Sequence, residues 1–193
     1  MEKIGDDWYI FYHRHTNGTN YSRQGCLEKL SFNADGTIQQ AEMTSCGSVR
    51  PLRGEGYYPA YIACHLFTDT EVTYLPWSGW MDDRFPKITQ EIEEGGKGIG
   101  YIANMRNSAT AGFRYFDCRG VKSISVRTKG YATGKIEIRT SWDGEPIGEI
   151  PVGYANVWHD TEAGIAVPDG VRSLYFTFAG QGHLQFAGFT LGT

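Results

Sequence analysis

Apolar and polar residues alternate with a period of two along much of the chain, the spacing of a β-strand with one buried and one exposed face. The alternation is clearest in residues 123–127, 135–139 and 173–178. Turn signals such as Asp143-Gly144 and Pro168-Asp169-Gly170 separate such runs. The clearest strand-like runs in the C-terminal part are residues 99–104, 112–117, 121–128, 135–141, 147–152, 162–167, 173–179 and 183–191. No helical stretch is evident, so we expect a two-sheet β-sandwich of the jelly-roll type.

The N-terminal part has a different pattern. Residues 8–15, 20–32 and 37–44 are predicted as three strands, joined by turns at Asn17-Gly18 and Asp35-Gly36. This is a β-meander, the unit of a propeller blade. The first strand is apolar on both faces, so it requires a neighbour on each side or would self-associate.

The segment between the two parts has the composition of a linker or wrapping loop, from residue 45 to residue 56. We therefore divide the chain into a domain fragment at residues 1–50 and a second domain at residues 57–193.

Composition and charge support this interpretation and exclude some partners. Aromatic residues make up 14% of the chain and Gly numbers 25, which suits short strands and tight turns. The net charge of −4 argues against nucleic acid or an anionic membrane as partner and is compatible with a neutral polysaccharide. No stretch has the length of a transmembrane helix, and residues 1–7 lack the order of a signal peptide.

The four cysteines are expected to be free, buried thiols. Cys26, Cys46, Cys64 and Cys118 match no zinc-site spacing. In the predicted hairpin Cys26 faces Met43, which leaves Cys46 roughly 10 Å away, too far for a disulfide without a bulge.

Particular motifs resemble known families. Residues 8–18, with Ser22-Arg23-Gln24-Gly25-Cys26 and residues 42–47, resemble the last part of a family 43 glycoside hydrolase propeller, above all that of bacterial arabinoxylan-debranching enzymes. The region from residue 57 to the end resembles a family 6 carbohydrate-binding module. The resemblance implies an all-β chain, a jelly-roll β-sandwich preceded by a β-meander like the last blade of a five-bladed propeller. It also implies an extracellular or periplasmic location.

In the first half, the resemblance assigns no catalytic residue. Glycoside hydrolysis needs two facing carboxyl groups, about 6.5–9.5 Å apart for inversion. In family 43 these groups come from earlier blades, whose motifs this sequence lacks, so the chain alone is not expected to hydrolyse a glycoside. The match to Phe11-Tyr12-His13 makes His13 the candidate ligand of a metal near the propeller axis, and Arg23 would line the sugar pocket. The alternatives are a space-filling role for His13 and a surface role for Arg23.

In the second half, the resemblance implies a sugar site at three positions. Phe113 takes the place of the first platform aromatic, Trp158 that of the second, and Gln185 that of an asparagine that bonds the sugar. Core packing of Phe113 and edge burial of Trp158 are the alternatives. Calcium is the cofactor implied, but Cys64 and Ala187 replace the glutamate and aspartate that usually bind it.

Three functions follow from these observations. The first is binding of xylan or arabinoxylan, which would hold an attached catalyst near its substrate. The second is participation in an active family 43 arabinofuranosidase, xylosidase or xylanase, completed by an upstream catalytic propeller. The third is a structural brace without a ligand of its own.

Overall fold

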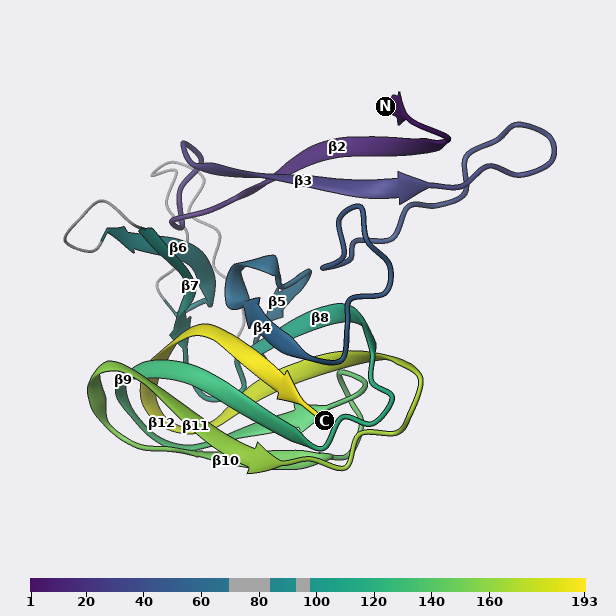
Figure 1. The fold of residues 1–193 in the computed structure, drawn as a ribbon. Coiled ribbons are helices and arrows are strands. Elements are labelled where there is room, and N and C mark those ends of the chain that lie inside the picture. Colours follow the sequence, from purple (N-terminus) through teal and green to yellow (C-terminus); the bar gives the residue numbers. More distant parts are fainter. Residues whose placement is uncertain (70–83, 93–97) are drawn as a thin grey trace.

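The computed structural model describes residues 1–69, 84–92 and 98–193 (Figure 1). The described chain forms a small N-terminal sheet above a larger β-sandwich, with one short 3-10 helix between strands. The all-β prediction is confirmed. No helix within the described residues is long and apolar enough to cross a membrane.

The N-terminal sheet contains three antiparallel strands in the order β1-β2-β3. Its strands are β1 (Glu2–Ile4), β2 (Asp7–His15) and β3 (Arg23–Leu30). The prediction of a third strand at residues 37–44 is wrong, because that segment makes only one bridge, between Phe32 and Ile38, and β1 pairs with β2 instead.

A tertiary contact explains the lost strand. Glu42 accepts hydrogen bonds from Arg114 (2.6 Å) and Tyr115 (2.7 Å), and Thr44 bonds to Glu28. The segment leaves the sheet to reach the sandwich.

Within the described residues, the sandwich contains nine strands and the short helix. They are β4 (Gly56–Pro59), η1 (Ala60–Ile62), β5 (His65–Phe67), β6 (Lys87–Ile92), β7 (Gly98–Met105), β8 (Thr110–Asp117), β9 (Ser123–Arg139), β10 (Gly148–Val152), β11 (Ala155–Gly164) and β12 (Val171–Gly192). The pairings between these described strands are antiparallel, and β12 is central because it pairs with β4, β7, β8 and β9.

The strands β9 and β12 each merge two predicted strands into one. They pair with each other from Tyr175↔Arg139 to Gly192↔Ser123 and curve together around the core (Figure 1). Glycines allow this bend: a Cβ on Gly134 (φ 149°) would lie 2.3 Å from the Ala179 carbonyl oxygen. These glycines lie between the predicted strand runs, and they let the chain curve without breaking the ladder.

One hydrophobic core fills the sandwich. The inward-facing residues of the alternating runs are buried, which confirms the period-two pattern. The largest fully buried side chains are Phe113, Phe116, Phe176, Phe178, Phe186, Phe189, Ile102, Met105, Ile124, Ile136, Ile138 and Ile150. Burying each side chain of this size contributes about 1.5–3 kcal/mol.

Polar contacts join the N-terminal sheet to the sandwich. Arg14 donates to the carbonyl oxygens of Tyr61 and Ala63, and Gln24 Nε2 donates to Tyr61 O over 3.3 Å. Burial lowers the pKa of Arg14. This face of β2 and β3 therefore lies against the rest of the chain.

The buried carboxylate of Glu28, which is 2% exposed, strengthens the junction. It accepts hydrogen bonds from the Thr44 backbone (2.7 Å), the Thr44 hydroxyl (2.8 Å) and Arg50 (2.5 Å). The first predicted strand, now β2, therefore has the packing neighbour expected for it on one of its two faces. The opposite face leaves Phe11 54% exposed.

Candidate functional site

Three side chains meet around Trp158 at one rim of the sandwich. The Tyr101 ring on β7 lies edge-on to the indole, with centroids 5.4 Å apart. The Lys129 ammonium on β9 lies 4.5 Å from the Trp158 ring centroid. Glu91 on β6 accepts hydrogen bonds from Trp158 Nε1 and from Lys129 Nζ, both at 2.6 Å. We call these four residues the Trp158 cluster.

Hydrogen bonds within the cluster favour the ionised form of Glu91. Partial burial acts to raise the pKa of Glu91, but hydrogen bonds from Lys129 and Trp158 outweigh burial and hold that pKa below its ordinary value. Glu91 is therefore an anion at neutral pH, and Lys129 has a partner for its charge. The cation–π contact adds up to about 2 kcal/mol when it is desolvated.

A β-bulge sets the position of Trp158. The pairing of β11 with β9 shifts register between Ala155 and His159, so residues 156–158 leave the ladder. Bulges of this kind redirect side chains, often beside functional sites. Here the bulge brings the indole against Lys129.

Gln185 adjoins the cluster through the strand register. It pairs with Lys129 across β12 and β9, so both side chains lie on the same face of the sheet. Its Oε1 atom is buried and has no hydrogen-bond partner among the described residues. Leaving a buried acceptor without a hydrogen bond costs about 1–3 kcal/mol. This oxygen is therefore suited to accept a hydrogen bond from a hydroxyl group.

The aromatic surface continues beyond Gln185. Tyr131 pairs with His183 one step along the same face, and its exposed ring lies 4.9 Å from that of Tyr154. Rings and polar groups therefore alternate along this rim.

Phe113 lies elsewhere. Its ring is 0% exposed and packs edge-on against Phe176 (5.4 Å) and Phe189 (4.9 Å) in the core. No ligand can stack on it there, so a platform role does not fit this structure. The ring beside Trp158 is Tyr101, which was not predicted as a site residue. The signal was available: Ile102 is buried, so its neighbour Tyr101 must face outward.

His13 lies on β2 and Arg23 on β3 of the N-terminal sheet, whereas the Trp158 cluster is formed by strands of the sandwich. His13 pairs with Gly25 and His15 pairs with Arg23, so these side chains share the face opposite Arg14. Both His13 and Arg23 are exposed. In the described part of the chain no group of three or more His, Cys, Asp or Glu could hold a metal ion.

The positions expected for calcium do not fit that ion. Cys64 is buried, and its thiol donates to the Gly112 carbonyl over 3.5 Å. Ala187 is buried and offers no side-chain donor. Calcium requires six to eight oxygen ligands, which these residues do not supply. All four cysteines are free, as expected, although Cys26 is only half-buried.

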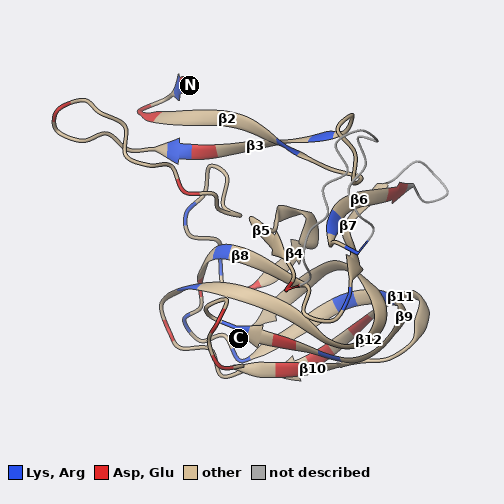
Figure 2. Ribbon diagram, turned by 180° about the vertical axis from the view of Figure 1, so that it is seen from behind, with Lys and Arg blue, Asp and Glu red and all other residues tan. Residues whose placement is uncertain are grey.

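Charges elsewhere on the sandwich are mixed in sign. Figure 2 shows Lys and Arg interspersed with Asp and Glu over the outer strands. Pairs such as Lys135–Glu149 (2.6 Å) and Arg127–Asp160 (3.1 Å) account for this mixture. Such a surface suits a neutral ligand better than a polyanion.

The chain was compared with protein families and with known proteins. No protein-family model matches the chain. A protein of Thermoclostridium stercorarium named xylosidase/arabinosidase is 54% identical over 193 residues, 99% of this chain and 41% of that protein. This chain thus spans about two-fifths of the length of that relative.

Two solved structures share the fold. A family 6 carbohydrate-binding module from Clostridium stercorarium, in complex with cellobiose, covers 74% of this chain and 96% of its own, with TM-score 0.56 and 18% identity. A family 43 arabinoxylan arabinofuranohydrolase from Bacillus subtilis, in complex with cellotetraose, covers 98% of this chain and 39% of its own, with TM-score 0.60 and 22% identity. These similarities confirm the resemblance found in the sequence.

Proposed function

We propose that this chain, a relative of a xylosidase/arabinosidase along 99% of its length and a carrier of the family 6 carbohydrate-binding fold, binds saccharides at the Trp158 cluster. The ligand class is xylan or arabinoxylan. Binding would keep an attached catalyst close to its substrate, which raises effective concentration without new chemistry.

One observation supports this proposal above the others. Two half-buried aromatic rings, those of Trp158 and Tyr101, lie edge to face near Gln185, whose buried Oε1 has no hydrogen-bond partner among the described residues. A pyranose ring lays its C–H face on aromatic rings, while polar groups around them bond its hydroxyls. The cluster offers both kinds of contact.

The cluster is closed in the described state, which affects affinity. Lys129 covers one face of the Trp158 ring, and Glu91 holds it there. A sugar must therefore displace Lys129 or use the other face of the indole. Displacement forfeits the cation–π contact, so we expect weak binding to a single site.

A titration tests the proposal. Calorimetry with xylotetraose, an arabinose-substituted xylotetraose and cellotetraose would compare the wild-type chain with Trp158→Ala. Trp142→Ala is the matched control, because Trp142 is 63% exposed on the loop between β9 and β10, outside the cluster. We expect Trp158→Ala to weaken binding about tenfold or more and Trp142→Ala to leave binding at the cluster unchanged.

A second candidate function is a structural brace. The ion pair that closes the cluster and the polar contacts of Arg14 and Glu28 favour it. Absence of heat or fluorescence change with any of the three oligosaccharides would contradict saccharide binding and favour the brace.

The wider setting is part of the same proposal. Residues 1–50 would belong to a catalytic propeller and residues 57–193 to the binding module, in an arabinoxylan-degrading glycosidase outside the cytoplasm. The exposed face of β2, with Phe11, is the surface on which the rest of that propeller, or a second copy, would pack.

A further inference from the structure

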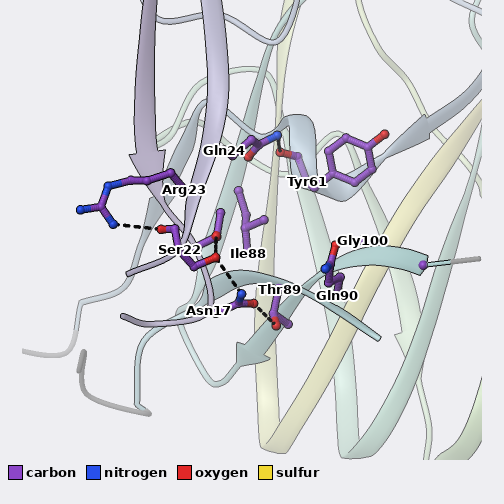
Figure 3. A pocket seen from close by; sticks show the side chains of 11 residues that line it. Asn17, Ser22, Arg23, Gln24, Tyr61, Ile88, Thr89, Gln90 and Gly100 are labelled. Atoms are coloured by element: carbon purple, nitrogen blue, oxygen red, sulfur yellow. Dashed lines mark hydrogen bonds between the residues drawn. The ribbon is translucent and has the colours of Figure 1, made fainter. Parts of the chain in front are cut away.

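A hollow lies between the N-terminal sheet and the β6–β7 ribbon. Its volume is about 390 Å³, within the range of small-molecule sites. Figure 3 shows its lining. The residues that matter for the argument are Asn17, Ser22, Gln24, Tyr61, Gln90 and Gly100.

This hollow is separate from the Trp158 cluster. On the ribbon, Gln90 pairs with Gly100, whereas Glu91 pairs with Ile99. Neighbouring positions on a strand point to opposite faces, so Gln90 and Glu91 lie on opposite sides of the ribbon. Gln90, Gly98 and Gly100 therefore face the hollow from one side of the ribbon, whereas Glu91 and Tyr101 of the Trp158 cluster lie on the other side. Thr89, on the Glu91 side, meets the hollow through its hydrogen bond to Asn17.

The Tyr61 ring forms an aromatic wall backed by glycine. A Cβ on Gly100 would lie 2.6 Å from Tyr61 Cδ1, so the ring rests directly on the strand backbone. Tyr61 remains 38% exposed. Gly98 lies two positions away on the same side, and its absent side chain keeps the hollow open.

The polar wall is held in place by hydrogen bonds. The Asn17 backbone donates to the Ile88 carbonyl (2.7 Å), and the Thr89 hydroxyl donates to Asn17 Oδ1 (2.6 Å). Asn17 Nδ2 donates to Ser22 Oγ (2.9 Å) (Figure 3). This network joins the turn after β2 to the ribbon, so the wall exists only when the two parts are docked.

The lining suits a neutral ligand. Arg23 is the one charged residue among the described residues of the lining, and its guanidinium donates to the Ser22 carbonyl, turned away from Tyr61 (Figure 3). The remaining polar groups are amides and hydroxyls. Amides and hydroxyls around one exposed aromatic ring are the chemistry that recognises a saccharide.

We propose that this hollow is a second saccharide site, formed jointly by the N-terminal sheet and the sandwich. A pyranose would stack on Tyr61, and Gln90 would bond its hydroxyls, together with the hydrogen-bonding capacity that the Asn17 and Gln24 amides retain beside their contacts within the protein. The site does not depend on Trp158, so it stands or falls separately from the proposed function.

The test uses the full chain and xylotetraose in calorimetry. In a Trp158→Ala background, which removes the first site, we expect residual binding with one site per chain. Adding Tyr61→Ala should weaken that residual binding about tenfold, the change that corresponds to roughly 1.4 kcal/mol.

A second variant distinguishes a lost binding site from a folding defect caused by Tyr61→Ala. Gly98→Leu fills the hollow, and a Cβ there meets nothing closer than 3.6 Å. Gly164→Leu is the matched control, because its Cβ would lie 3.8 Å from the Lys122 carbonyl on a distant exposed position. We expect loss of residual binding with Gly98→Leu and no change with Gly164→Leu.

The outcomes separate the two proposals. If Trp158→Ala alone abolishes all binding, or if Gly98→Leu leaves residual binding intact, the second site is overturned. If Trp158→Ala has no effect while Tyr61→Ala and Gly98→Leu remove binding, the second site stands and the Trp158 cluster fails.

Discussion

The sandwich and the N-terminal sheet are both antiparallel β-structure, but different forces hold them. In the sandwich, six phenylalanine rings are fully buried in one core. In the N-terminal sheet, Tyr9 and Leu30 are the buried hydrophobic residues of the described strands, and Phe11 and Trp8 remain exposed. The sheet is fixed instead by Arg14, Gln24 and Glu28.

The difference teaches which part can be expected to fold alone. Hydrophobic burial is non-directional and cumulative, so the sandwich carries its own stability. Hydrogen bonds contribute about 0.5–1.5 kcal/mol each and require both partners in place. The N-terminal sheet therefore depends on the sandwich or on further protein, whereas the reverse does not hold.

The strongest test of this contrast compares two phenylalanines. Phe113→Ala removes a fully buried ring and should destabilise the chain by about 3–5 kcal/mol. Phe11→Ala removes an exposed ring of the N-terminal sheet and should change stability by about 0.5 kcal/mol or less. Urea denaturation followed by fluorescence measures both. Equal effects would contradict the contrast.

Glu28 tests how the sheet is held. Glu28→Ala leaves the Thr44 and Arg50 donors without their acceptor, so we expect a loss of about 1–3 kcal/mol. The loss should be local, with faster hydrogen exchange in residues 40–50 and unchanged exchange in β9 and β12. Lys29→Ala is the control, because the Lys29–Asp7 pair is solvent-exposed. Faster exchange throughout the sandwich would show that the two parts unfold together.

The Glu91 ion pair gives a smaller effect that depends on pH. The folded-state pKa of Glu91 lies below its ordinary value, so its contribution to stability is present above the unfolded pKa of about 4.3. That contribution is lost as the pH falls through the lower folded value. We expect the Trp158 indole N–H resonance to shift in acid, and Glu91→Gln to remove this titration. A resonance that does not move between pH 6 and 2.5 would contradict the prediction.

His13 should show the smallest effect. Its side chain is exposed on the outward face of β2, so His13→Ala should change stability by less than about 0.5 kcal/mol. Saccharide binding by this chain should also stay constant, as measured by the same titration. A loss of binding would connect the outward face to the saccharide sites.

Local sequence patterns predicted the strands of the sandwich. The candidate site was predicted only in part, because its residues meet through long-range contacts. The alternation at Ile124, Val126, Ile136 and Ile138 identified core positions because strand periodicity needs only near neighbours. Trp158 was named as a candidate from the family resemblance. Lys129 and Glu91 were not, because 38 residues separate the two charges that meet beside it.

Two errors have definite physical causes. Residues 37–44 have strand character, but Glu42 gains hydrogen bonds with Arg114 and Tyr115 that lie outside any local window. The assignment of Phe113 followed motif position, whereas its pairing with Leu174 turns the ring inward. In both cases tertiary structure overrode a local signal.

The β6–β7 ribbon has one candidate site on each of its faces, and this arrangement restricts how a polymer could engage it. A single straight glycan cannot touch both faces unless it turns around the end of the ribbon. Two separate glycan strands face no such restriction. A protein that gripped one strand on each side would cross-link polysaccharides, so mixing it with soluble arabinoxylan would raise the viscosity of the solution.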